Sequence, residues 1–153
     1  MRYFVAALAL ASMTTACSDT AGPAAVISDE LAGTWEAAEH CLPECGFTLQ
    51  RLDNPADSIN FVSSLMQTFV FTLTTSGRFG LTAPGGGTTI RGEAYMEGGT
   101  LIFRDQAGAQ DTADYALTGR YLGLTFRTVT SSFDFDGDGV GDPSIVRARF
   151  EKQ

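Results

Sequence analysis

Histidine is almost absent from this sequence, which contains one, His40. Cys41 follows it and is expected to be oxidised, so no free histidine remains for a serine–histidine or cysteine–histidine pair. The stretch Pro84-Gly85-Gly86-Gly87 lacks the lysine and the helix of a phosphate-binding loop and indicates a hairpin tip. Acidic side chains crowd into residues 134–142, where nothing predicts the burial that raises a carboxyl pKa for acid–base catalysis. We therefore expect a protein that is not an enzyme.

Positive charge is also scarce. The chain carries 10 lysines and arginines against 18 acidic residues, which gives a formal net charge of −8. A surface of this sign repels the phosphates of nucleic acid and the headgroups of anionic lipids. Neither is expected as a partner.

No apolar run near the amino terminus is long enough to span a bilayer, which takes about 20 residues. Residues 3–11 are apolar, Arg2 precedes them, and small residues lead from them to Cys17. This is the layout of a secretory signal, so residues 1–16 are expected to be removed. Residues 17–30 are small and polar without periodicity, which predicts a tether to a folded domain at residues 31–153.

The end of this signal, Thr14-Thr15-Ala16-Cys17, resembles the bacterial lipobox, although that motif usually has Leu where this chain has Thr14. The resemblance implies that Cys17 is acylated and becomes the first mature residue, so the partner is a membrane of the bacterial cell envelope. Anchoring is stable when more than one acyl chain inserts. By analogy with the lipoproteins of enteric bacteria, Ser18 rather than Asp after the cysteine favours the outer membrane. The alternative is an ordinary signal peptide with an incidental cysteine.

The rest of the chain has the alternation of β-strands. Phe69, Phe71 and Leu73 alternate with residues of the opposite face, the period of two that places one face of a strand on a core. Glycine-bearing turns, such as Ser76-Gly77 and Thr118-Gly119, separate such runs and predict antiparallel hairpins. Strand-like runs lie at residues 33–39, 46–51, 67–74, 78–83, 89–96, 100–105, 112–118, 120–128 and 145–151.

The predicted fold class is all-β, an antiparallel up-and-down meander of eight or nine strands. Such a meander packs as two sheets or closes into a barrel, and hairpins without long crossovers favour the barrel, which leaves no exposed edge. One short helix is expected, beginning at Asn54 and Pro55 and ending at Ser64.

The first predicted strand contains Gly33-Thr34-Trp35, which resembles the Gly-x-Trp motif that opens the lipocalin and wider calycin families. The resemblance covers residues 31–152 and implies a small barrel. In these families the tryptophan packs at the closed end with a late arginine over it, which implies end packing by Gly33, Trp35, Arg147 and Arg149. It also implies a small apolar ligand at the open mouth. The 11 phenylalanines could instead fill the barrel, and then the protein is a structural or interaction module of the envelope.

Cys41 and Cys45 flank a Leu-Pro-Glu turn between two predicted strands. In an oxidising compartment this spacing predicts a disulfide. A metal site using His40 with both cysteines is the less favoured alternative, because it has three local ligands and adjacent residues of an extended chain point to opposite faces.

The last motif is acidic, FDFDGDGVGD at residues 133–142. Its spacing resembles the calcium loops of EF-hands and of FG-GAP hairpins, and Ile145 at the twelfth position favours the second. Alternate carboxylates on a tightly turning backbone can converge on one calcium ion. The motif predicts that calcium is bound by Asp134, Asp136, Asp138, Asp142 and the carbonyl of Val140. The alternative is an acidic turn without metal.

Overall fold

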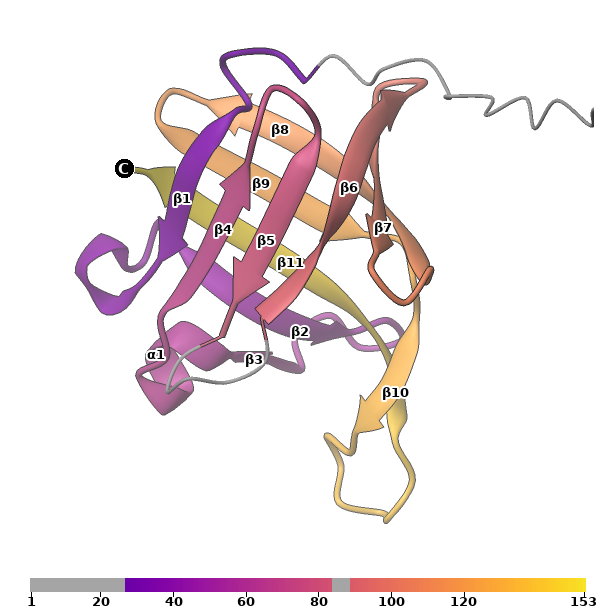
Figure 1. The fold of residues 1–153 in the computed structure, drawn as a ribbon. Helices are drawn as coiled ribbons and strands as arrows, with labels where there is room; N and C mark the ends of the chain where they lie inside the picture. The colour runs from indigo at the N-terminus through magenta and orange to yellow at the C-terminus, as the bar shows by residue number, and fades with distance from the viewer. Residues whose placement is uncertain (1–26, 84–88) are drawn as a thin grey trace, which may run out of the picture.

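Eight antiparallel strands close into a barrel in the computed structural model, which describes residues 27–83 and 89–153 (Figure 1). Around the barrel the order is β1-β4-β5-β6-β7-β8-β9-β11, and β11 pairs again with β1. The predicted all-β barrel is confirmed. The barrel strands are β1 (Gly33–Ala37), β4 (Phe69–Leu73), β5 (Arg78–Thr82), β6 (Thr89–Glu97), β7 (Thr100–Asp105), β8 (Gln110–Thr118), β9 (Tyr121–Phe126) and β11 (Asp142–Lys152).

The predicted signal, Cys17 and most of the tether lie outside the described residues, as does the glycine-rich stretch at residues 84–88. Within the described ranges, no helix has the length and apolar character needed to cross a membrane.

Strand β1 and strand β2 (Gly46–Arg51) lie along the same edge of β11. On β11, Glu151 pairs with Glu36 of β1. Two residues earlier, Arg149 pairs with Gly46 of β2. The residues between Glu36 and Gly46 therefore leave the sheet as an excursion, which contains the short helix η1 (Glu39–Cys41). Strand β3 (Ser58–Asn60) pairs with the outer edge of β2, and β10 (Thr130–Phe133) forms a hairpin with β11 that extends beyond the barrel (Figure 1).

The hairpin turns predicted within the described residues are present. Glu97 pairs with Thr100, so Gly98 and Gly99 form a two-residue turn, and both have positive φ, 56° and 84°. Such a turn matches the right-handed twist of the flanking strands, and glycine adopts it without a steric penalty. Turns at Gly77 and Gly119 join β4 to β5 and β8 to β9 at the same end of the barrel.

The short helix was predicted in the wrong place. Helix α1 (Phe61–Leu65) begins after Asn60, whose side chain accepts a hydrogen bond from the Val62 amide at 3.0 Å. Asn54 instead begins a turn closed by the amide of Asp57, at 2.9 Å from the Asn54 carbonyl. This turn reverses the chain from β2 into β3, and the pairing of β3 with β2 decides where the helix can start.

Candidate functional site

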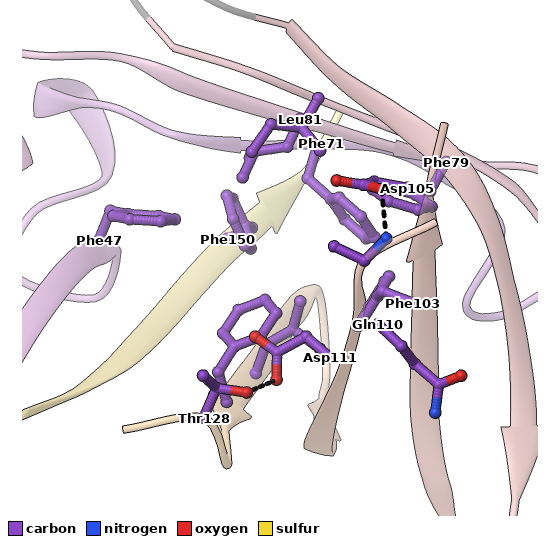
Figure 2. Close-up of a pocket in the computed structure, with 14 residues that line it drawn as sticks. Phe47, Phe71, Phe79, Leu81, Phe103, Asp105, Gln110, Asp111, Thr128 and Phe150 are labelled. Carbon is purple, nitrogen blue, oxygen red and sulfur yellow. Dashed lines mark hydrogen bonds between the residues drawn. The ribbon is translucent and has the colours of Figure 1, made fainter. Parts of the chain in front are cut away.

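An apolar cavity of about 340 Å³ opens at one end of the barrel (Figure 2). Small-molecule sites in proteins begin at about 300 Å³, so the cavity has room for a small ligand. Six phenylalanines from β2, β4, β5, β7, β9 and β11 supply most of its surface. The lining residues are Phe47, Phe71, Phe79, Leu81, Ile90, Phe103, Asp105, Ala109, Gln110, Asp111, Leu124, Phe126, Thr128 and Phe150.

The rings pack against one another along the wall. Phe103 is central: its ring centroid lies 5.1 Å from that of Phe79 and 5.7 Å from that of Phe126. Phe47 stacks on Phe69 with centroids 4.3 Å apart. Edge-to-face and offset contacts of this kind stabilise aromatic pairs beyond their burial. The phenylalanines of the lining are thus in contact with one another around the cavity.

Polar side chains form the rim of the cavity, at the turn between β7 and β8 and at the end of β9. Asp105 accepts a hydrogen bond from the Ala109 amide at 2.8 Å, and Asp111 accepts one from the Thr128 hydroxyl at 2.6 Å (Figure 2). Both carboxylates are half-buried. Lysine, arginine and histidine are missing from the described residues that line the cavity.

The opposite end of the barrel is closed by Trp35, which is 1% exposed. Its indole N–H donates to the Leu31 carbonyl at 2.9 Å. Lys152 covers the ring, with Nζ 5.0 Å from the ring centroid and 2.9 Å from the Glu30 carbonyl oxygen, to which it donates. Gly33 has a φ of +147°, and a Cβ there would lie 3.0 Å from Cε of Lys152. Gly33 and Trp35 thus both lie next to the Lys152 side chain.

The assignment of Arg147 and Arg149 to this packing is wrong. Along β11 the alternation buries Ala148 and Phe150 and leaves both arginines exposed on the outer face. Arg149 lies over the Tyr121 ring at 4.8 Å and 3.4 Å from a carboxylate oxygen of Glu44. Lys152 is the cation that lies over the Trp35 ring. Its position two residues after Phe150 places it on the same face of β11 as Ala148 and Phe150.

The Cys41–Cys45 disulfide is confirmed, with Cα atoms 5.4 Å apart and both residues buried. It closes the excursion between β1 and β2. Because both sulfurs are bonded to each other, the metal site that would use them with His40 does not form. The imidazole Nε2 of His40 lies instead 3.6 Å from a carboxylate oxygen of Glu151.

The acidic motif occupies the loop between β10 and β11, and the structure brings three of its aspartates together. One carboxylate oxygen from each of Asp134, Asp136 and Asp138 lies within 4.8 Å of the other two. The carboxylate of Asp134 accepts the amides of Gly137 at 2.6 Å and Gly139 at 2.8 Å. These hydrogen bonds, that from Gly139 first, lower the pKa of Asp134, so it is ionised at neutral pH.

Asp142, the fourth predicted ligand, is engaged elsewhere. One of its carboxylate oxygens lies 2.8 Å from Nη2 of Arg51, and the other accepts the Phe135 amide at 2.7 Å. Val140, whose carbonyl is the remaining predicted ligand, is 66% exposed, and its amide donates to Asp138 at 2.8 Å. The donor set fits an ion held by three carboxylates, with Asp142 outside the group.

The sequence did not predict that Arg51 contacts the acidic loop. Its guanidinium lies 3.1 Å from Asp136 and 2.6 Å from Asp53, in addition to its contact with Asp142. Arg51 reaches the acidic loop because it pairs with Ser144 where β2 meets β11. This pairing joins distant segments of the chain, so the local sequence does not predict it. Arg51 therefore supplies part of the countercharge for which a metal ion was predicted.

Comparisons with protein-family models, with curated proteins and with solved structures found no match to this chain.

Proposed function

We propose that this protein is a lipid-anchored, non-catalytic binding protein of the bacterial cell envelope that holds a small apolar ligand in the phenylalanine-lined cavity. The observation that carries the proposal is the cavity itself, about 340 Å³ lined mainly by aromatic and aliphatic side chains. Removing an apolar ligand from water into such a site is favourable by roughly 25 cal/mol per Å² of buried surface. Trp35 is buried toward the other end, so a ligand is expected to enter and leave by the open mouth.

Ile90 gives a way to test this without disturbing the core. It lines the cavity and is 45% exposed at the mouth, so a larger side chain there can obstruct the opening without overpacking the interior. The probe is N-phenyl-1-naphthylamine, a neutral apolar dye whose fluorescence rises when it leaves water, excited beyond the absorption of tryptophan.

The unaltered protein should enhance the dye fluorescence with a saturable, single-site titration. Ile90→Trp should weaken this binding about tenfold or more, because it occupies part of the mouth. Val140→Trp is the matched control, since Val140 is an exposed apolar residue of the β10–β11 loop. Absence of enhancement in the unaltered protein would favour the alternative function, a structural or interaction module with no ligand. Equal binding by Ile90→Trp would place the dye outside this cavity.

The lipid anchor is supported by the lipobox resemblance at Cys17, and the described residues do not include it. Expression of the full-length chain in a bacterium should give a membrane-bound protein that is extracted with detergent. Cys17→Ser should release it into the soluble fraction of the envelope, because acyl chains supply the membrane affinity. Membrane association that persists in Cys17→Ser would remove the anchor from the proposal and leave the cavity untouched.

We propose as a second function that the β10–β11 loop binds one calcium ion, which stabilises the last hairpin. The supporting observation is the approach of the Asp134, Asp136 and Asp138 carboxylates to within 4.8 Å of one another. Calcium takes six to eight oxygen ligands, so carbonyl oxygens and water would complete the shell. Calcium would supply positive charge to all three grouped carboxylates, whereas Arg51 pairs with only Asp136 among them.

A further inference from the structure

We propose that the ligand of the cavity is an apolar molecule carrying a protonated amine, and that carboxylate ligands such as fatty acids are disfavoured. This rests on the proposed binding function. The proposal is based on the rim of the cavity. Asp105 and Asp111 are the charged residues among the described residues that line the cavity. A mouth with two carboxylates and an apolar interior is complementary to an amine with an apolar body.

The rim carboxylates retain capacity to accept further hydrogen bonds. The contact of Asp105 with the Ala109 amide and those of Asp111 with Thr112 and Thr128 all use Oδ1. Oδ2 of each aspartate has no hydrogen-bond donor within the described part of the chain. A primary ammonium group offers three donors, so it can bind these oxygens without displacing the bonds that hold the rim.

No arginine is among the described residues that line the cavity, although Arg78, Arg91 and Arg104 line a neighbouring pocket that shares Asp105 with it. Arg127 pairs with Asp114 on the outside of the barrel, at 3.2 Å from Nε. Arg104 is exposed and reaches Oε1 of Gln110 at 3.5 Å from the outer face, and it does not line the cavity. The segment 84–88, Pro-Gly-Gly-Gly-Thr, contains no ionisable side chain.

The aromatic wall favours a cation as well. The face of a phenylalanine ring attracts a cation within about 6 Å and repels an anion. Figure 2 shows the Phe79 and Phe103 rings near the rim residues Asp105 and Gln110. The net charge of the chain, −8, adds a field of the same sign. A carboxylate head at this mouth would meet two aspartates, and no cationic side chain is among the described residues that line the cavity.

Three probes that share one ring system separate charge from apolar fit. They are 2-(2-naphthyl)ethylamine, which is cationic at neutral pH, 2-ethylnaphthalene, which is neutral, and 2-naphthylacetate, which is anionic. Each is measured by displacement of N-phenyl-1-naphthylamine at low ionic strength. The amine should bind at least about tenfold more tightly than the acetate, with the neutral compound between them. Salt at about 1 M should reduce the difference in affinity between the amine and the acetate, because it screens the interaction between charges.

The variants Asp105→Asn and Asp111→Asn test whether these two carboxylates cause the preference for the amine. Each removes one negative charge, and the asparagine oxygen can still accept the existing hydrogen bonds of the rim. Each should weaken amine binding about threefold to tenfold and leave 2-ethylnaphthalene unchanged. Glu97→Gln is the matched control: it removes the same charge from an exposed residue beside the turn at the opposite end of the barrel.

The outcomes distinguish this inference from the function on which it rests. If the dye binds and all three probes displace it equally, or if the two asparagine variants leave the amine unaffected, the charge preference is wrong and the apolar site stands. If neither the dye nor any probe binds, the binding function fails together with the inference.

Discussion

The ammonium of Lys152 lies 5.0 Å from the centre of the Trp35 ring, at the barrel end opposite the cavity. Lys152 is the only lysine in the sequence. Its contact with Trp35 joins the last residues of β11 to the first strand of the barrel, where the sheet closes. The same ammonium donates to Glu30 just before that strand.

Lys152→Met tests the charge of this contact, because methionine keeps an apolar stem over the ring and removes the ammonium. We expect the free energy of unfolding to fall by about 0.5–1 kcal/mol, the usual size of an exposed cation–aromatic contact. Urea denaturation followed by the fluorescence of Trp35, the single tryptophan, measures it. Arg147→Met is the control and should change stability by less than about 0.5 kcal/mol, since Arg147 is exposed on the outer face. A loss of equal size in both variants would contradict the packing role of Lys152.

The barrel was predictable because its determinants are local. Alternating residues such as Phe69, Phe71 and Leu73 face the core, and glycine turns set the hairpins. The short strands β3 and β10 were missed because neither carries a clear alternation, and each exists through its pairing with a neighbouring strand.

The site was less predictable because it depends on how distant segments meet. The phenylalanines could have filled the barrel or lined a cavity, and composition cannot decide between these. The structure has a cavity among them, and its six phenylalanines come from six different strands. Arg51 was missed for the same reason. The arginines near the end of the chain were assigned to Trp35 through a family resemblance, whereas the alternation along β11 points them outward.

The Cys41–Cys45 disulfide should stabilise the fold without being required for it. It closes a short excursion between β1 and β2, and the chain-entropy account gives roughly 2 kcal/mol for a loop of this size. The double variant Cys41→Ala/Cys45→Ala should stay folded and lose about that much in urea denaturation. Dithiothreitol should destabilise the unaltered protein similarly and leave the double variant unaffected. An equal effect of the reductant on both proteins would show that the bond is not its target.

Arg51 should make stability depend on pH in the acid range. Its hydrogen bond lowers the pKa of Asp53, so folding favours the ionised carboxylate. A group with a lowered folded pKa contributes stability above its unfolded pKa, about 3.9 for aspartate, and that contribution is lost as the pH falls through the folded pKa.

Arg51→Met should therefore be destabilised most at neutral pH, and its difference from the unaltered protein should shrink below about pH 4. Urea denaturation at several pH values between neutrality and acid measures this difference. Arg147→Met, which removes an exposed arginine, should give a small difference that does not depend on pH. A constant penalty for Arg51→Met across the range would mean that packing, rather than its ion pairs, is lost.

Calcium should raise the melting temperature of the protein. The shift should increase with the ratio of the calcium concentration to the dissociation constant. Three grouped carboxylates without a bidentate glutamate predict modest affinity, about 0.1–1 mM, the range of extracellular calcium modules. Asp138→Asn is the sharpest test, because Asp138 belongs to the group and forms no ion pair with Arg51 in the described structure, whereas Asp136 lies 3.1 Å from it. This variant should lose the calcium-dependent shift and remain folded. Asp142→Asn should keep the shift yet lower stability without calcium, since Asp142 pairs with Arg51 instead. If millimolar calcium gives the unaltered protein no thermal shift and no heat of binding, the loop is an acidic turn neutralised by Arg51 alone.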